Sequence, residues 1–253
     1  MAQTPSGHLK HFELKTFADS TELAQTVAGL WLDVVEQSRR QDIAHTVAFS
    51  GGRIAAGFFI KTAVRSITRE LSLAHVDFFW GDERCVPPDD PESNFLLANH
   101  LLASQNIPSE KVHRLRGEIE PAIAVAEANA EIFKTISQRK NGMPVLDIVF
   151  LGVGPDGHVA SLFPNASFDV VGCQSPFLFI DNAPKPPPQR ISLSYAAIAA
   201  AKEVWVLVSG EGKERVLTES LTYRGQTPLA KVLQSRTQTK IFTDLKLNDV
   251  AGL

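Results

Sequence analysis

Short apolar runs alternate along this chain with segments of helical periodicity, and this alternation restricts the fold more than any other feature. The runs typical of strands are His11–Phe17, Thr46–Ser50, Val76–Trp80, Lys111–Leu115, Leu146–Leu151, Phe177–Ile180, Arg190–Ser194, Val204–Ser209 and Lys240–Phe242. Strands that alternate with helices predict a mostly parallel sheet with helices on both faces. We therefore expect an α/β protein with a three-layer α/β/α arrangement.

The expected helices lie between these runs. One apolar face extends from Leu23 to Val35, with Asp19 or Ser20 as its N-cap. The other helical segments are Ile54–Val64, a stretch from Phe95 to Leu102 after a Ser93 cap, and the alanine-rich segment Ile123–Ile136.

The segment from Pro164 to Gln189 interrupts the alternation, because it contains prolines at 164, 176, 184 and 186–188. A chain of 253 residues is long enough for one large domain or two small ones, and a two-domain chain would divide here. However, Val204–Ser209 is another apolar strand of the same type. We therefore expect one continuous domain over residues 1–253, with a proline-stiffened insertion.

The net charge of −3 gives the chain no general attraction to nucleic acid or to anionic membranes. An anionic substrate therefore requires a local cluster of positive groups. No apolar run approaches the ~20 residues of a membrane span, and the first fifteen residues lack the apolar core of a signal peptide. We expect a soluble, cytoplasmic protein, either a monomer or a small homo-oligomer, with no nucleic-acid or membrane partner.

The two cysteines, Cys85 and Cys173, are too few for a thiolate metal site. A disulfide between them is one alternative, and reduced thiols are the state expected in a cytosolic protein. We expect no metal and no organic cofactor.

The run Leu146–Leu151 ends in a G-x-G-x-x-G match formed by Gly152, Gly154 and Gly157, the pattern of a dinucleotide-binding turn. Asp181, after a second strand, stands near the position of the ribose-binding acid. A parallel crossover requires a dozen or more residues, usually a helix. Pro164 and Pro176 leave room for only about two helical turns. The pattern therefore does not indicate a nicotinamide or flavin enzyme.

Four polar junctions follow the apolar strands, and ligands of α/β sheets bind at the carboxyl ends of strands. The junctions are Ser50-Gly51-Gly52, Gly81-Asp82-Glu83-Arg84, the stretch from Gly152 to His158, and Gly210-Glu211-Gly212-Lys213. Each junction also has a purely structural interpretation, namely a tight turn, a solvated polar loop, a structural histidine or a solvent-facing lysine. Together they predict the walls of one pocket.

His158 lies two residues after Asp156, and a nearby carboxylate fixes the tautomer of an imidazole and raises its basicity. Lys213 at a predicted helix start opposes the helix dipole unless an anion binds there. The planar guanidinium of Arg84 is suited to phosphate. The four junctions thus favour a phosphate-bearing substrate presented to a histidine base.

Five blocks of the sequence resemble the 6-phosphogluconolactonase family, within the glucosamine-6-phosphate deaminase/ribose-5-phosphate isomerase superfamily. The blocks are VAFSGG (47–52), FFWGDERCVPPDDPESN (78–94), LDIVFLGVGPDGHVASLFP (146–164), APKPPPQRISLS (183–194) and WVLVSGEGK (205–213). The resemblance implies a mostly parallel Rossmann-like sheet of the NagB/RpiA/CoA-transferase-like type. It also implies metal-independent hydrolysis of 6-phospho-D-glucono-1,5-lactone to 6-phospho-D-gluconate, the second step of the oxidative pentose phosphate pathway.

The resemblance further implies a role for each matching residue. Three residues are expected to be catalytic. His158 would activate the attacking water with Asp156 as a supporting carboxylate, and Asp82 stands where the related deaminases have a base. Asp82 and Glu83 match the acidic pair of the family. The residues expected to hold or border the substrate are Gly51, Gly52, Arg53, Glu83, Arg84, Arg190 and Lys213.

Arg53 departs from the family pattern, which usually has a hydroxyl residue after Ser-Gly-Gly. Either Arg53 replaces that hydroxyl as a phosphate donor, or it points to solvent. We therefore rank the Gly51–Arg53 assignment below that of Arg84. Two alternative functions remain, a sugar-phosphate isomerase or deaminase and a non-catalytic sugar-phosphate sensor. The SLFP sequence after His158 argues against the first, and only a site blocked by Arg53 would favour the second.

Overall fold

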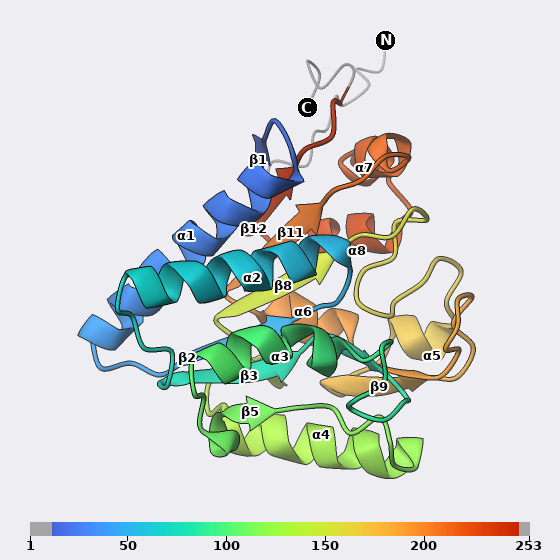
Figure 1. The fold of residues 1–253 in the computed structure, drawn as a ribbon. Coiled ribbons are helices and arrows are strands. Elements are labelled where there is room, and N and C mark those ends of the chain that lie inside the picture. The colour runs from blue at the N-terminus through green and yellow to red at the C-terminus, as the bar shows by residue number, and fades with distance from the viewer. Residues whose placement is uncertain (1–11, 248–253) are drawn as a thin grey trace.

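The computed structural model describes residues 12–247, which form a central sheet with helices packed around it (Figure 1). The strand order of the seven-stranded sheet is β1-β12-β11-β8-β2-β3-β5. All neighbouring strands are parallel, which confirms the predicted α/β fold. The strands are β1 (Phe12–Thr16), β2 (His45–Phe49), β3 (Val76–Trp80), β5 (Val112–His113), β8 (Ile148–Gly152), β11 (Glu203–Val208) and β12 (Thr239–Thr243).

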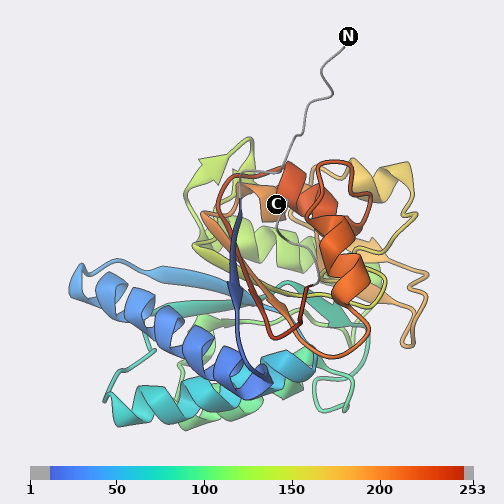
Figure 2. The same ribbon diagram turned by 90° about the horizontal axis from the view of Figure 1, so that it is seen from above.

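Helices lie on both sides of this sheet, as the two views show (Figures 1 and 2). On one face lie α1 (Ser20–Arg40), α2 (Arg53–Thr68) and α3 (Asn94–Ser104), and α2 packs between the other two. The remaining helices are α4 (Pro121–Thr135), α5 (Phe168–Val171), α6 (Tyr195–Ala200), α7 (Glu214–Ser220) and α8 (Pro228–Gln234), with a 3₁₀ turn at Ser109–Lys111. The predicted caps Asp19 and Ser93 begin α1 and α3.

Two of the predicted strands do not join the central sheet. β9 (Phe177–Ile180) and β10 (Arg190–Leu193) form a separate antiparallel sheet with β4 (Asp82–Arg84). The proline-rich connection between β9 and β10 is too short for a parallel crossover, so the chain turns back on itself. β4 follows β3 after a single glycine, and its pairing with β10 places Arg84 opposite Arg190. A further hairpin joins β6 (Arg139–Lys140) and β7 (Met143–Pro144).

The core beneath the site is aromatic and fully buried. Trp31 of α1 lies 5.5 Å from Phe49 and 5.9 Å from Phe150, measured between ring centroids. Phe58 of α2 lies 4.7 Å from Phe150. Burial of each such side chain contributes about 2–3 kcal/mol. These contacts fix β2 and β8, whose carboxyl ends carry two of the four junctions.

Cys85 and Cys173 are free thiols in the structure, and no disulfide joins them. Burial, with the nearby Glu83 carboxylate, raises the pKa of Cys85 to about 11, so this thiol is not an activated nucleophile. No helix between residues 12 and 247 is long and apolar enough to cross a membrane. Residues 1–11, which include His11 and most of the stretch in which we expected no signal peptide, lie outside the described residues.

Candidate active site

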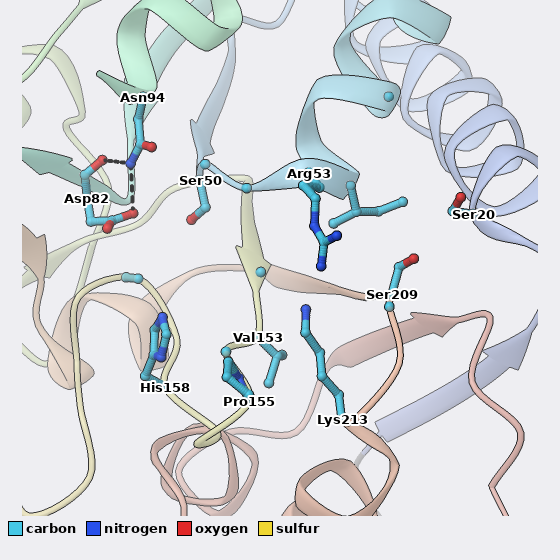
Figure 3. A pocket seen from close by; sticks show the side chains of 18 of the residues that line it. Ser20, Ser50, Arg53, Asp82, Asn94, Val153, Pro155, His158, Ser209 and Lys213 are labelled. Atoms are coloured by element: carbon cyan, nitrogen blue, oxygen red, sulfur yellow. Dashed lines mark hydrogen bonds between the residues drawn. The ribbon is translucent and has the colours of Figure 1, made fainter. Parts of the chain in front are cut away.

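A cavity of about 690 Å³ opens at the carboxyl ends of β2, β3, β8 and β11 (Figure 3). Because the carboxyl ends of parallel strands meet at one edge of the sheet, all four junctions contribute to it, as predicted. The residues that line it from these junctions are Ser50, Gly51, Gly52, Arg53, Asp82, Arg84, Gly152, Val153, Gly154, Pro155, His158, Ser209, Gly210 and Lys213.

His158 lies on the cavity wall, and its imidazole is held by Asp156. The Nδ1–Oδ1 distance is 2.5 Å. An ionised carboxylate only accepts hydrogen bonds, so Nδ1 carries the hydrogen and Nε2 keeps a free lone pair. Burial lowers the pKa of His158 below its ordinary value, and the Asp156 carboxylate opposes this shift only in part. At neutral pH the imidazole is therefore unprotonated at Nε2, the state a general base requires.

The glycines of this turn make room for the imidazole. A Cβ atom on Gly154 would lie 2.0 Å from the Cε1 and Nδ1 atoms of His158. Gly157 has a φ of 79°, and a Cβ there would lie 2.8 Å from Thr227. The chain then forms a bridge between Val159 and Leu162 in place of a crossover helix. The structure thus confirms that the G-x-G-x-x-G match is not a dinucleotide turn.

A buried polar cluster surrounds Asp82, which lies at the same end of the cavity as His158 (Figure 3). The Asp82 Oδ2 atom accepts a hydrogen bond of 2.7 Å from Ser161, in the segment that follows His158. Asn94 at the start of α3 donates to Oδ1 at 3.3 Å and to the Asp82 carbonyl oxygen at 2.9 Å. Two residues from separate segments, Ser161 and Asn94, therefore fix the Asp82 carboxylate.

Arg53 and Lys213 face each other at the other end of the cavity (Figure 3). Neither side chain forms a hydrogen bond or an ion pair with any residue between 12 and 247. Burial, and next the positive charge of Arg53, lower the pKa of Lys213. Gly52 precedes α2 without a side-chain cap, so backbone N–H groups at this helix start are also free. Two unpaired cations beside a free helix N-terminus form a site suited to a phosphate.

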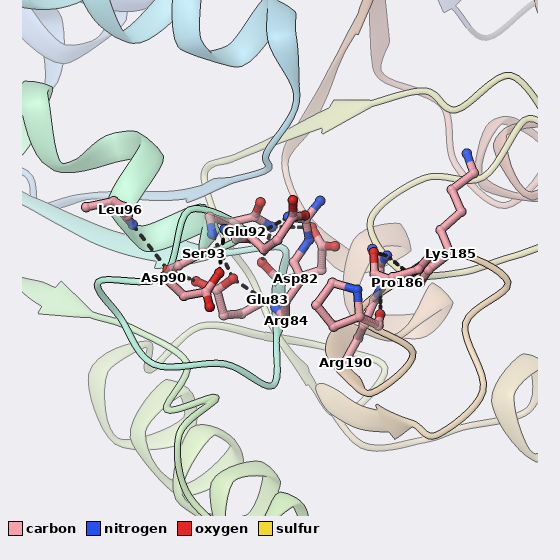
Figure 4. Close-up of polar contacts among 12 residues, drawn as sticks. Asp82, Glu83, Arg84, Asp90, Glu92, Ser93, Leu96, Lys185, Pro186 and Arg190 are labelled. Atoms are coloured by element: carbon pink, nitrogen blue, oxygen red, sulfur yellow. Dashed lines mark hydrogen bonds and ion pairs between the residues drawn. The ribbon is translucent and has the colours of Figure 1, made fainter.

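Arg84 and Arg190, in contrast, already have partners within the chain (Figure 4). Arg84 Nη1 donates to the carbonyl oxygen of Glu92 and lies 3.4 Å from the Glu92 carboxylate. Arg190 is 4% exposed and donates to the carbonyl oxygens of Pro187 and Lys185 at 3.0 and 3.1 Å. Both arginines line the cavity, but their hydrogen bonds hold the two loops that border it.

Glu83 does not line the cavity. Its carboxylate accepts hydrogen bonds from Ser93 Oγ and from the backbone N–H groups of Arg84, Asn94 and Phe95, at 2.7–3.0 Å. These bonds satisfy the free donors at the start of α3. The expectation that Glu83 binds the substrate is therefore corrected, because this carboxylate anchors a helix.

Among residues 12–247, no group of three His, Cys, Asp or Glu side chains is arranged to hold a metal ion. The other charged residues of the cavity are Lys61, Glu92, Lys185 and Asp244. The cavity thus carries an excess of positive charge, concentrated on Arg53, Lys213 and Lys185.

Comparison with known proteins places this geometry in a family. A sequence profile of the family described as glucosamine-6-phosphate isomerases/6-phosphogluconolactonase matches residues 18–241. The chain belongs to this family. The family relative named 6-phosphogluconolactonase from Streptomyces coelicolor is 33% identical over 221 residues, which cover 85% of this chain and 84% of the relative.

Solved structures of the family have the same fold. The 6-phosphogluconolactonase of Trypanosoma brucei superposes with a TM-score of 0.80 at 25% identity, covering 91% of this chain and 94% of that one. A monomeric glucosamine-6-phosphate deaminase of the NagB superfamily has a TM-score of 0.75 at 16% identity, covering 91% of this chain and 96% of that one. The second likeness shows the fold alone, and it confirms the expected NagB-like type.

Three polar residues in or beside this cavity were not predicted from the sequence: Asn94, Ser161 and Lys185. Each of the three lies inside a sequence block that resembles the family, and this location could have identified them as candidate site residues. Asn94 and Lys185 line the cavity, whereas Ser161 reaches it only through Asp82.

Proposed function

We propose that this chain hydrolyses 6-phospho-D-glucono-1,5-lactone to 6-phospho-D-gluconate, as a single catalytic domain in the oxidative pentose phosphate pathway. The observation that carries the proposal is one cavity with a neutral His158 held by the Asp156 carboxylate at one end and the facing cations Arg53 and Lys213 at the other. The name 6-phosphogluconolactonase, borne by relatives at 33% and 34% identity over most of the chain, supports it.

In the proposed first step, His158 Nε2 removes a proton from a water molecule as the water oxygen attacks the lactone carbonyl carbon. Asp156 holds the Nδ1 hydrogen and stabilises the imidazolium that forms. General-base assistance of this kind contributes roughly 100- to 10,000-fold to the rate.

In the second step, the tetrahedral intermediate collapses and the bond from the carbonyl carbon to the ring oxygen breaks. The imidazolium of His158 returns its proton to the departing ring oxygen, which becomes a hydroxyl group. The carboxylic acid that forms releases its remaining proton to solvent, so the product has a carboxylate at one end and the phosphate at the other. No step requires a metal or an organic cofactor.

The phosphate binds at the end of the cavity remote from His158. We assign it to Arg53, Lys213 and the free N–H groups that follow Gly51 and Gly52. Binding energy from this remote group orients the lactone toward the base. Arg84 and Arg190 border the substrate but chiefly hold the surrounding loops, and Asp82 contacts the sugar ring.

A coupled assay tests the proposal. Freshly prepared lactone is added to the protein, and 6-phosphogluconate dehydrogenase reports the product through its reduced nicotinamide. We expect strong acceleration over spontaneous hydrolysis and no turnover of glucosamine 6-phosphate. An uncatalysed rate with the lactone would refute the proposal, and ammonia release from glucosamine 6-phosphate would favour the deaminase. The cavity remains open beside Arg53, which argues against the non-catalytic sensor.

A further inference from the structure

Asn94 presents an unused hydrogen-bond acceptor to the cavity. The residue is 3% exposed, and it lines the cavity wall beside Asp82. Its Nδ2 atom donates to two oxygen acceptors of Asp82, and this fixes the orientation of the amide. The Oδ1 atom therefore faces away from Asp82, toward the Ser50 side of the cavity (Figure 3). Between residues 12 and 247, no group donates a hydrogen bond to it.

The local packing provides space for this oxygen. A Cβ atom on Gly51 would lie 1.9 Å from Asn94 Oδ1. Position 51 therefore requires glycine for the turn after β2 and also for the Asn94 amide, because any side chain at position 51 would displace this amide. The backbone of Gly51, in the loop assigned to the phosphate, and the Asn94 amide are consequently in direct contact.

The position of the amide indicates what kind of group it binds. Figure 3 shows Asn94 and Asp82 at one end of the cavity and the cations Arg53 and Lys213 at the other. An amide oxygen and a carboxylate are acceptors, so this wall is complementary to donors and unfavourable to phosphate. Between its phosphate and its reacting carbon, the proposed lactone carries hydroxyl groups, which are donors.

We propose that Asn94 determines substrate specificity: its Oδ1 atom accepts a hydrogen bond from a ring hydroxyl of the lactone, while its Nδ2 atom holds Asp82 beside it. The inference rests on the proposed function, since it names the part of that substrate which the site recognises. A site built to bond a hydroxyl rejects an analogue that lacks it, because the buried acceptor is left unpaired.

The test compares 6-phosphogluconolactone with its 2-deoxy and 3-deoxy analogues, using the proton released on hydrolysis as the signal. The wild-type protein is expected to favour the parent over one analogue by roughly 10- to 100-fold in kcat/KM. In Asn94→Ala the same ratio should fall below about threefold, because parent and analogue then lack the contact equally.

Ser161→Ala is the matched control. It removes the 2.7 Å bond to the same Asp82 carboxylate, but Ser161 does not line the cavity. Its kcat/KM should fall for all three lactones alike, and the preference for the parent should persist.

Equal losses for all three lactones in Asn94→Ala, with the wild-type preference unchanged, would overturn the inference and leave a structural role. Equal kcat/KM values of the wild-type protein for the three lactones would overturn the inference as well. This measurement does not depend on whether Asn94→Ala folds. In both cases hydrolysis of the parent lactone persists. Its absence in the wild type would instead refute the proposed function.

Discussion

The two ends of the cavity use positive charge in opposite ways. At the end assigned to the phosphate, Arg53 and Lys213 face each other, and neither has a partner among residues 12–247 (Figure 3). At the other end, Arg84 is paired with Glu92, and Arg190 is bonded to the carbonyl oxygens of its own loop. All four cations line one cavity, but Arg53 and Lys213 have no internal partner, whereas Arg84 and Arg190 each use part of their guanidinium donors within the chain.

This difference shows that the sign of a charge does not by itself identify an anion site. A buried cation whose donors are satisfied stabilises the protein, and a ligand must compete with its internal partners. Two facing cations repel each other until an anion binds between them. Burial, and next the positive charge of Arg53, lower the pKa of Lys213, and the second of these causes is this repulsion. Variants at the two ends should therefore have separable effects.

The largest expected effect is on catalysis alone. His158→Ala should lower kcat by about 100- to 10,000-fold, because the base is lost. The dissociation constant of 6-phosphogluconate, measured by calorimetry, should change less than about threefold because the phosphate end is intact. His100→Ala, on the exposed side of α3, is the control and should retain full activity. Full activity of His158→Ala would show that the general base does not lie at this end of the cavity.

Asp156→Asn should lower kcat on the order of 100-fold, since the amide no longer fixes the tautomer of His158. In the wild type, kcat/KM should fall as pH decreases through a pKa below the ordinary histidine value. The Asp156 carboxylate raises that pKa, so its removal should move the acid limb to still lower pH. A limb displaced to higher pH would contradict the assigned hydrogen bond.

Lys213→Ala should raise KM by roughly 10- to 100-fold, the loss expected for one charge-assisted hydrogen bond to phosphate. The value of kcat should fall much less. Lys140→Ala, at an exposed position on β6, provides a matched loss of charge and should leave both constants unchanged. A large fall in kcat with constant KM would place Lys213 at the reacting end instead.

Arg53→Ala and Arg84→Ala compare the two ends of the cavity directly through their effects on KM. Arg53→Ala should raise KM by about tenfold, whereas Arg84→Ala should raise it by less than about threefold, since Arg84 is already paired with Glu92. Steady-state kinetics of the two variants decide the ranking. A larger effect of Arg84→Ala would break the distinction between the two ends.

The smallest expected effect concerns stability. The lowered pKa of Lys213 means that its protonation opposes folding at neutral pH. Lys213→Met should therefore raise the midpoint of thermal unfolding by about 1–3 °C in the absence of ligand. It should also abolish the stabilisation that inorganic phosphate gives to the wild type. A lowered midpoint with intact phosphate stabilisation would show that Lys213 is not repelled in the free protein.

The sequence predicted the parallel sheet and the four junctions because strand and helix periodicities, together with glycines at strand ends, are local properties. It did not predict the antiparallel sheet, since β4 has only three residues, and its pairing with β10 joins positions about one hundred residues apart. It also ranked Arg84 above Arg53 as a phosphate ligand. That ranking depends on whether each guanidinium has an internal partner, which only the folded chain determines.

The candidate site shows the same limit. His158 and Asp156 are two residues apart, so the sequence indicated a supporting role for Asp156, but it did not decide whether Asp156 or Asp82 orients the imidazole, and the structure shows that Asp156 does. Asp82, Ser161 and Asn94 come from three separate segments, and nothing local distinguishes Asn94 from an ordinary residue at the start of a helix. Glu83 was misassigned for a related reason, because its true partners are the backbone N–H groups of that helix.

A crystal structure with 6-phosphogluconate bound tests the separation of the two ends most directly. We expect phosphate oxygens about 2.7–3.0 Å from the Arg53 guanidinium and the Lys213 ammonium, with the product carboxylate beside His158 Nε2. Arg84 should remain paired with Glu92. A phosphate bound to Arg84, with Glu92 displaced and Arg53 directed to solvent, would contradict the account.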